Sequence, residues 1–487
     1  MYEGWFGMDS TIQNPNMGKK RDMKKKADRL WFPKLSKVEV GYLILCFCIY
    51  LFWAMTFTMW EYGPDEYMRF DIPKYIYTNN ALPVGSEESI RNPIWGFSYG
   101  FDIELPYILE ACMMKVMSLF SQEHIPMLIA ARLVSVLSTV GVGYFAIVFS
   151  KKTMGKSPMR WVFIVLMTLL PQIVFLGSYV NRDVFSLFTV MWILYGWVIC
   201  LEREWDCSSS CFLAVGLGLC LLSYQFAFSY VLATFFFYIS WHLLNRQKRN
   251  FKAFMKTGIM ILAIVFVLCG WKFIRNAILY DGDFLSLHTN SKYQELYAME
   301  EYKPSVMKSP IENGIGLKTM LIDMSWISMT WKSLIGIFGY MNILLPEGYY
   351  RFFGVLLVIG LAGMVLKGIQ SAVNNKGERE WMQTPLLIGF WMLFASFVTV
   401  CISIRFSWFG SFQPQGRYVI AITPLLFIVI AMGLEQWIEL FGDRILRKQK
   451  LTWELKVLCS RCFFTFLLSS VFFSYYTCLC VFIYPKG

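Results

Sequence analysis

Charged residues are scarce in this chain. Asp, Glu, Lys and Arg make up only 16% of its 487 residues, whereas 56% are hydrophobic and 18% are aromatic. A soluble domain carries about a quarter of its residues as charges, because its surface faces water. The mean hydropathy is +0.48. The composition therefore excludes an ordinary soluble enzyme and indicates a protein that lies largely within a lipid bilayer.

Histidines and paired cysteines are also scarce. The three histidines, His124, His242 and His288, stand far apart, and the pair Cys459–Cys462 has neither a second pair nor a nearby His. Zinc sites need such ligands in converging groups, so we expect no metal site and no cofactor. The acidic residues are compatible with a divalent cation, but no motif indicates one.

Long apolar blocks run through the chain instead. Each holds about twenty residues, enough to cross a hydrocarbon layer of about 30 Å as a helix. The alternating pattern of a membrane β-barrel is lacking, and helices satisfy their own backbone hydrogen bonds in lipid. We therefore expect an all-α integral membrane protein with about eleven transmembrane helices. The predicted spans lie near residues 38–59, 125–150, 161–179, 184–200, two within 211–244, 257–273, 350–366, 385–404, 418–439 and 462–484.

Basic residues indicate the orientation. The net charge is +12 at pH 7, and Lys and Arg gather in the N-terminal 37 residues and after most even-numbered spans. Cytoplasmic loops collect such residues, so we expect residues 1–37 to form a cytoplasmic tail and the first span to be an uncleaved anchor. No motif of a nucleic-acid module is visible, and the lipid bilayer explains the positive charge without one.

The same alternation of basic and acidic loops divides the chain into segments. Residues 38–440 are expected to form the main membrane domain, followed by an inner basic loop and a final transmembrane helix in residues 441–487. Apolar stretches at 105–120 and 317–345 are expected to lie along the membrane surface as loop helices. The outer loops of the main domain are predicted at 60–104, 275–348 and 405–417.

Two adjacent carboxylates follow the first predicted span. Asp65 and Glu66 come directly after Gly63-Pro64, at the outer membrane surface. Carboxylates at that depth suit a general base or an acceptor-binding site. A turn that begins with Pro64 and places Asp65 as a helix N-cap explains the same residues without any catalytic role. Local spacing leaves both interpretations open.

Polar residues also stand at the second to fourth spans. Asn181 and Asp183 lie in a tight turn, where both residue types are favoured for conformational reasons alone, unless the turn faces a shared cavity. Arg132 is the ionisable residue deepest in an apolar run, so it should face the interior of the bundle. We expect it to pair with a buried acid or with carbonyl groups, and Glu110 is one candidate partner.

Three arginines lie at predicted outer boundaries, where topology disfavours positive charge. They are Arg275, Arg405 and Arg417, the last within Gln415-Gly416-Arg417-Tyr418. The planar guanidinium matches the oxygens of a phosphate, so together they could form a pocket for a lipid phosphate. Anchoring to lipid headgroups is the alternative explanation.

Taken together, these motifs resemble a bacterial family of membrane proteins of unknown function that is grouped with the GT-C glycosyltransferases. The resemblance covers roughly residues 38–440. It departs from the family pattern at Tyr224-Gln225-Phe226, where a Lys-Pro is often found, and in lacking a large C-terminal outer domain. The motifs that carry it are Pro64-Asp65-Glu66, Ala131-Arg132-Leu133, Asn181-x-Asp183, Arg275-Asn276, Tyr280-x-Gly282-Asp283, Trp331-Lys332-Ser333 and Gln415-Gly416-Arg417-Tyr418.

The resemblance implies an enzyme of the bacterial cytoplasmic membrane. Such enzymes transfer a sugar from a polyprenyl-phosphate donor to a cell-envelope glycan or lipid acceptor on the extracytoplasmic side. Their usual catalytic residue is an acidic side chain in the first outer loop, which here is Asp65 or Glu66. The resemblance also makes Arg417, with Arg275 or Arg405, the candidate ligands of the donor phosphate. A single base with a phosphate leaving group predicts inversion at the anomeric carbon.

Two other functions use the same features. A transporter or flippase of lipid-linked sugars needs the same phosphate pocket, but transporters usually place broken helices and ionisable groups near the membrane midplane. Only Arg132 comes close to that depth in the sequence. A non-catalytic membrane subunit of a polysaccharide assembly complex would need no base at Asp65, so replacing this residue with Asn distinguishes it from an enzyme.

Overall fold

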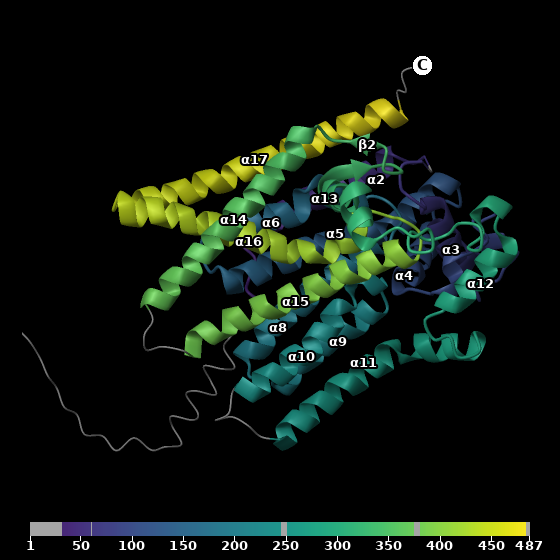
Figure 1. Cartoon of the computed structure of the whole chain (residues 1–487), viewed down its shortest axis with the longest axis horizontal. Helices are drawn as coiled ribbons and strands as arrows, with labels where there is room; N and C mark the ends of the chain where they lie inside the picture. Colours follow the sequence, from purple (N-terminus) through teal and green to yellow (C-terminus); the bar gives the residue numbers. More distant parts are fainter. Residues whose placement is uncertain (1–31, 60, 245–250, 375–379, 484–487) are drawn as a thin grey trace, which may run out of the picture.

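The protein is a bundle of long α-helices with a cap of shorter helices at one end (Figure 1). The computed structural model describes residues 32–59, 61–244, 251–374 and 380–483. Within these ranges nine helical segments are long and apolar enough to cross a membrane, which confirms a multi-pass helical membrane protein. They are α2 (Lys37–Thr56), α5 (His124–Thr153), α8 (Asp183–Glu202), η3 with α10 (Gln225–Leu244), α11 (Phe251–Leu279), α14 (Glu347–Asn374), α15 (Glu380–Phe409), η7 with α16 (Gly416–Glu439) and α17 (Gln449–Phe482).

The third and fifth predicted spans are helical but shorter. α6 (Arg160–Leu169) ends before Pro171, and α7 (Pro171–Leu176) follows, because Leu170 takes an extended conformation that the next proline favours. α9 (Cys207–Leu221) has 15 residues. Every predicted span thus has a helical counterpart, while a count of eleven crossings stays a prediction.

Burial separates the centre of the bundle from its rim. The apolar windows of α5 and α8 are 72% and 83% buried, whereas those of α11 and α14 are 17% and 22% buried. Side chains on the rim, such as Val267 and Ile278, are 77% and 75% exposed. Apolar surface of this extent is stable in lipid rather than in water. Figure 1 shows α5 in the middle, with α11 and α17 on opposite sides of the bundle.

Small residues allow α14 and α16 (Thr423–Glu439) to touch through their backbones. A Cβ at Gly433 would lie 2.0 Å from the carbonyl oxygen of Gly360, and one at Gly363 would lie 2.2 Å from that of Gly433. Helices in lipid associate largely through such close packing. The hydrophobic effect does not drive them together, because lipid chains are as apolar as the side chains.

The cap comprises two segments, residues 61–123 and 280–346. The first contains α3 (Glu66–Asn79) and α4 (Leu105–Met117), and the second contains α12 (Leu287–Tyr297), α13 (Trp326–Gly336) and a two-residue hairpin, β1 (Ile337–Phe338) with β2 (Ile343–Leu344). All of them lie at the right-hand end of the bundle in Figure 1. The loop helices predicted in these segments are therefore present.

Two local predictions change with the structure. α4 buries one face against α3 and α5, so it is part of the packed cap as well as an apolar surface helix. The loop predicted at 405–417 begins as helix, because α15 continues to Phe409. Arg405 consequently lies in the last turns of α15 rather than in a loop.

Candidate active site

The turn after α2 places Asp65 at the start of α3 in an unusual conformation. Asp65 occupies the N-cap position with φ of 61° and ψ of 12°, in the left-handed region, and its side chain makes no capping hydrogen bond. Non-glycine residues reach this region at a cost and persist there when their surroundings hold them. The N-cap explanation therefore accounts for the position of Asp65 in the chain. It does not account for the contacts of its carboxylate, which binds partners outside α3 as well.

Those partners are cations and a phenol. Asp65 Oδ2 accepts a hydrogen bond from Arg417 Nη2 at 3.0 Å and one from Tyr99 at 3.3 Å, and it lies 3.7 Å from Arg69 Nη2. The side chain is 30% exposed. Burial raises the pKa of Asp65, but Arg417 and Arg69 outweigh it, so the pKa lies below its ordinary value. Asp65 is therefore a carboxylate at neutral pH.

Arg417 sits at the start of η7 (Gly416–Ile422), held there by the backbone. A Cβ at residue 416 would lie 2.1 Å from the backbone nitrogen of Leu334 in α13, so only glycine fits this approach. Tyr418, the next residue, stacks on Phe226 with ring centroids 4.9 Å apart. The Gly-Arg-Tyr sequence thus locks the guanidinium of Arg417 beside Asp65.

The guanidinium of Arg417 has unused donors. Its side chain is 6% exposed, and only Nη2 has partners, Asp65 Oδ2 and the hydroxyl of Tyr418 at 3.4 Å. Nε and Nη1 are buried without a hydrogen-bond partner in the described part of the chain. Buried donors of a charged group are costly to leave unpaired, so their persistence indicates a place where an anion can bind.

Two further arginines surround the pair. Arg69 Nη1 lies 3.3 Å from Asp183 Oδ2, and Arg182 Nη1 donates to Glu104 Oε1 at 2.8 Å. Both guanidinium carbons lie 5.3 Å from the ring centroid of Tyr99. One cluster therefore holds three arginines, contributed by α3, by the turn before α8 and by η7.

Several polar atoms of this cluster lack partners among the described residues. They are Arg69 Nε, Arg182 Nε, Asp183 Oδ1, Glu104 Oε2 and the hydroxyl of Tyr179. Burial raises the pKa of Glu104 to about 7, against the attraction of Arg182. Unsatisfied polar atoms concentrated in one place are typical of functional sites rather than of structural cores.

Glu66 and Arg132 form a structural pair instead. Arg132 Nε and Nη2 donate to the two oxygens of Glu66 at 2.7 and 2.6 Å, and both side chains are 0% exposed. Arg132 Nη1 donates to the carbonyls of Ala54 and Phe57 at 2.7 and 2.6 Å. The backbone N–H of Val180 donates to Glu66 at 2.8 Å. All parts of this group are hydrogen-bonded, which leaves Glu66 no free oxygen for chemistry.

The predicted environment of Arg132 is confirmed, but Glu110 as its partner is wrong. Arg132 faces the interior and pairs with an acid and with carbonyls, as expected. The acid is Glu66, because the first turn of α3 lies over the end of α2 where Arg132 points. Glu110 is 0% exposed on α4, and neither of its oxygens has a partner in the residues that the structure covers.

Asn181 and Asp183 have different positions in the tight turn. Asn181 Oδ1 accepts from the backbone N–H groups of Asp183 and Val184 at 2.9 and 3.2 Å, so it caps the start of α8. Asp183 is 0% exposed and faces Arg69. The conformational explanation therefore holds for Asn181, whereas Asp183 joins the arginine cluster.

Arg275, Arg405 and Gln415 are not brought into contact with Asp65. Arg275 Nη2 donates to the carbonyl of Pro83 at 2.7 Å, so it ties α11 to the cap. Arg405 is exposed on α15, with its guanidinium 5.6 Å from the ring centroid of Phe409. Gln415 contributes a carbonyl that accepts from the N–H of Tyr418 at 3.2 Å.

Sequence reasoning assigned no role in the site to Arg69, Arg182 or Tyr99. Arg69 stands four residues after Asp65, the helical spacing at which opposite charges meet, so this signal was available. Arg182, like Arg275, lies at a predicted outer end of a span. The argument that positive charge is disfavoured on that side therefore applied to Arg182 too. Tyr99 comes from an irregular stretch of the cap, and no local pattern indicates its position.

The comparisons with known proteins identify the fold. No protein-family model and no curated protein sequence matches the chain. The archaeal oligosaccharyltransferase AglB from Archaeoglobus fulgidus, in complex with an inhibitory peptide and a dolichol-phosphate, matches with a TM-score of 0.52 and 12% identity, over 93% of this chain and 56% of that one. Its apo form matches with a TM-score of 0.52 and 11% identity, over 90% and 55%. The chain has the GT-C fold.

The similarity to these GT-C structures is one of fold. ArnT from Cupriavidus metallidurans, bound to undecaprenyl phosphate, aligns with a TM-score of 0.48 and 12% identity, over 82% of this chain and 59% of that one. The chain spans little more than half the length of the AglB structures that it matches. The chemistry of its site has to be argued from its own residues.

The cluster suits an anion better than a cation. Asp65 already faces Arg417 and Arg69, so a divalent metal there would meet two positive charges. Within the described residues no group of three or more His, Cys, Asp or Glu side chains could hold a metal ion. An anion, in contrast, would meet the unused donors of Arg417.

Proposed function

We propose that this protein is a glycosyltransferase that moves a sugar from a polyprenyl-phosphate donor to a cell-envelope glycan or lipid acceptor. The observation that carries the proposal is the contact of Asp65 with Arg417, whose Nε and Nη1 are buried and unpartnered. Direct displacement of a sugar phosphate requires a base beside a group that can bind the phosphate. The dolichol-phosphate in the AglB complex supports a donor of this class.

Arg417 would bind the phosphate of the donor. Its two unpartnered nitrogens, Nε and Nη1, can each donate to a phosphate oxygen from either side of Nη2, which faces Asp65. A phosphate at Arg417 also competes with Asp65 for the same positive charge. The pKa of Asp65 then rises from its lowered value, and the carboxylate becomes a stronger base when the donor is in place.

Asp65 would act on the acceptor. As the acceptor hydroxyl oxygen forms its bond with the anomeric carbon, its proton passes to Asp65. The bond from the anomeric carbon to the phosphate oxygen breaks on the opposite face, and the electron pair leaves with the polyprenyl phosphate. Arg417 stabilises the charge that develops there. One displacement inverts the anomeric centre, so a product with retained configuration would contradict this mechanism.

Orientation and membrane form part of the same proposal. The end of the bundle opposite the cap carries the basic residues of the loops, including Lys151, Lys152 and Lys156. Cytoplasmic sides collect such residues, which supports our proposal of an N-terminus inside and a site on the extracytoplasmic face of the bacterial cytoplasmic membrane. The Glu66–Arg132 pair is closed and hydrogen-bonded, which supports an enzyme over a transporter with a charged route through the bilayer.

The test is turnover by the purified protein in lipid nanodiscs. A panel of polyprenyl-phosphate sugars is supplied with cell-envelope acceptors, and released polyprenyl phosphate is measured. We expect Asp65→Asn and Arg417→Ala to abolish release and the exposed control Arg351→Ala, 78% exposed on α14, to preserve it. Donor that binds but is never consumed would favour transport. Normal cellular function of Asp65→Asn would favour a non-catalytic subunit.

A further inference from the structure

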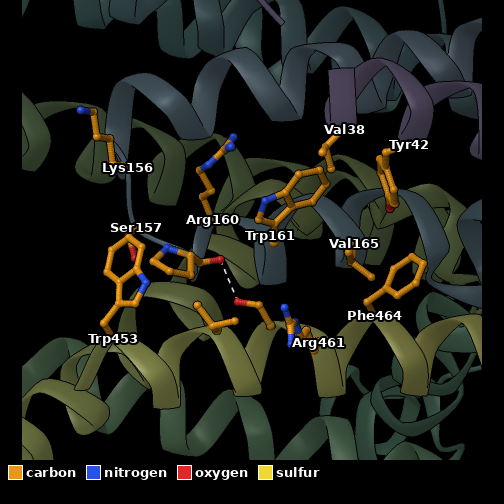
Figure 2. A pocket seen from close by; sticks show the side chains of 13 residues that line it. Val38, Tyr42, Lys156, Ser157, Arg160, Trp161, Val165, Trp453, Arg461 and Phe464 are labelled. Carbon is orange, nitrogen blue, oxygen red and sulfur yellow. Dashed lines mark hydrogen bonds between the residues drawn. The ribbon is translucent and has the colours of Figure 1, made fainter. Parts of the chain in front are cut away.

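A cleft lies at the end of the bundle opposite the cap. It has a volume of about 530 Å³ and opens between α2, α6 and α17. Figure 2 shows Arg160 and Trp161 of α6 on one side of this cleft and Trp453 and Arg461 of α17 on the other. From Tyr42, which lines the cleft, α2 rises about 21 Å to its end at Thr56, before the Asp65 turn, at 1.5 Å per residue. The cleft is therefore distinct from the candidate active site.

The lining of this cleft is positively charged. Lys156, Arg160 and Arg461 contribute to it, and no Asp or Glu does. Arg160 is partly neutralised, since its Nη1 donates to the buried Glu39 at 2.8 Å. Glu39 also accepts from Lys151 at 2.6 Å. Lys156 and Arg461 are exposed and form no ion pair with a carboxylate of the described residues. Two cations are thus free to bind an anion.

The rest of the lining is apolar or aromatic. Tyr42, Val165 and Phe464 lie together at one end of the cleft, Trp161 lies beside Arg160, and Trp453 lies at the other end beside Ser157 (Figure 2). Trp453 is 52% exposed. Tryptophan beside Lys and Arg is typical of the level where lipid headgroups meet hydrocarbon. The cleft therefore offers a charged mouth and an apolar wall at one membrane interface.

We propose that this cleft binds an anionic phospholipid. Lys156, Arg160 and Arg461 contact the headgroup phosphate, and one acyl chain lies along Val165 and Phe464. Basic pockets between transmembrane helices bind lipids in this way. A lipid fits better than a soluble phosphate, because the apolar wall would otherwise stay uncovered. The bound lipid would join α17 to α6. A hydrogen bond of 2.7 Å from Ser460 Oγ to the carbonyl of Pro158 already connects α17 to the turn that precedes α6.

The test measures lipid binding to the intact protein in detergent. Phosphatidylglycerol, phosphatidylcholine or inorganic phosphate is added. Binding is then measured by native mass spectrometry, and stability is measured as the melting temperature. We expect binding and stabilisation by phosphatidylglycerol alone. Each basic residue near a lipid surface changes affinity roughly five-fold, so the double variant Lys156→Gln, Arg461→Gln should weaken binding roughly twenty- to thirty-fold. Lys450→Gln, an exposed control in the same basic region, should leave it unchanged.

Each other outcome overturns the proposal. Equal stabilisation by phosphatidylcholine would show that the headgroup charge is irrelevant. Equal stabilisation by inorganic phosphate would assign the cleft to a soluble anion. Equal weakening by Lys450→Gln would indicate diffuse attraction to the basic surface rather than a site. If the double variant lowers the melting temperature without lipid, the mass-spectrometric affinity of the folded fraction still decides the question.

Discussion

The Glu66–Arg132 pair gives the sharpest prediction for stability. Replacing Arg132 with Met leaves Glu66 as a buried carboxylate and removes two donors from the carbonyls at the end of α2. Breaking a fully buried ion pair by removing one partner costs about 3–5 kcal/mol. We expect Arg132→Met to lower the free energy of unfolding by that amount, and Glu66→Gln to lower it by a somewhat smaller one.

The double variant separates the pair from its members. Glu66→Gln with Arg132→Met removes both charges, so its cost should be less than the sum of the single variants by about 2 kcal/mol or more. Arg351→Met is the matched control. Arg351 is 78% exposed and 4.0 Å from Glu347, and an exposed pair contributes at most about 0.5–1 kcal/mol.

Unfolding can be followed by the fluorescence of the 18 tryptophans during titration with SDS in mixed micelles. The account of this pair would be refuted if Arg132→Met lost less than about 1 kcal/mol. Strict additivity of the two single variants would refute it as well, because residues in direct contact should be coupled.

Three further predictions concern the site and the cap. Gly416→Ala should lower the melting temperature strongly, because the new Cβ would lie 2.1 Å from the backbone of Leu334; Gly348→Ala, with nothing within 4 Å, is the neutral control. Burial raises the pKa of Glu104 to about 7 from 4.5, so the stability it contributes is complete below about pH 4.5 and is lost as pH rises through about 7. The melting temperature of the parent, relative to Glu104→Gln, should therefore fall between about pH 5 and 8, and parallel curves would contradict this. Glu110→Leu should raise the melting temperature, because both oxygens of this buried carboxyl group lack a partner in the described structure; a clear decrease would show that Glu110 is paired.

The helical bundle could be predicted from the sequence because lipid imposes a simple rule. A crossing helix needs about twenty apolar residues, and such blocks are visible in any sequence. What the rule does not specify is where packing ends a helix. Pro171 divides the third span at Leu170, and α15 extends beyond its apolar block to Phe409. The first boundary follows from the proline, and neither boundary follows from hydropathy.

The sequence indicated some residues of the site, but it did not indicate which of them contact each other. Asp65 and Arg417 stood out because each carries charge at a predicted outer boundary. They are 352 residues apart, and no local pattern indicates that they touch. The partner of Arg132 depends on how α3 and α4 rotate about their axes. That rotation places Glu66 beside Arg132 and leaves Glu110 without a partner in the described residues.

The most direct test of the account is the affinity of the protein for polyprenyl phosphate without a sugar. Arg417 is proposed to hold the phosphate and Asp65 to compete for the same guanidinium. Binding, measured by native mass spectrometry in detergent, should therefore weaken about ten-fold or more in Arg417→Ala, a loss of roughly 1.4 kcal/mol or more. In Asp65→Asn it should be equal to or tighter than in the parent, although turnover is lost. Unchanged binding in Arg417→Ala, or a parallel loss of binding in both variants, would contradict the proposed division of roles.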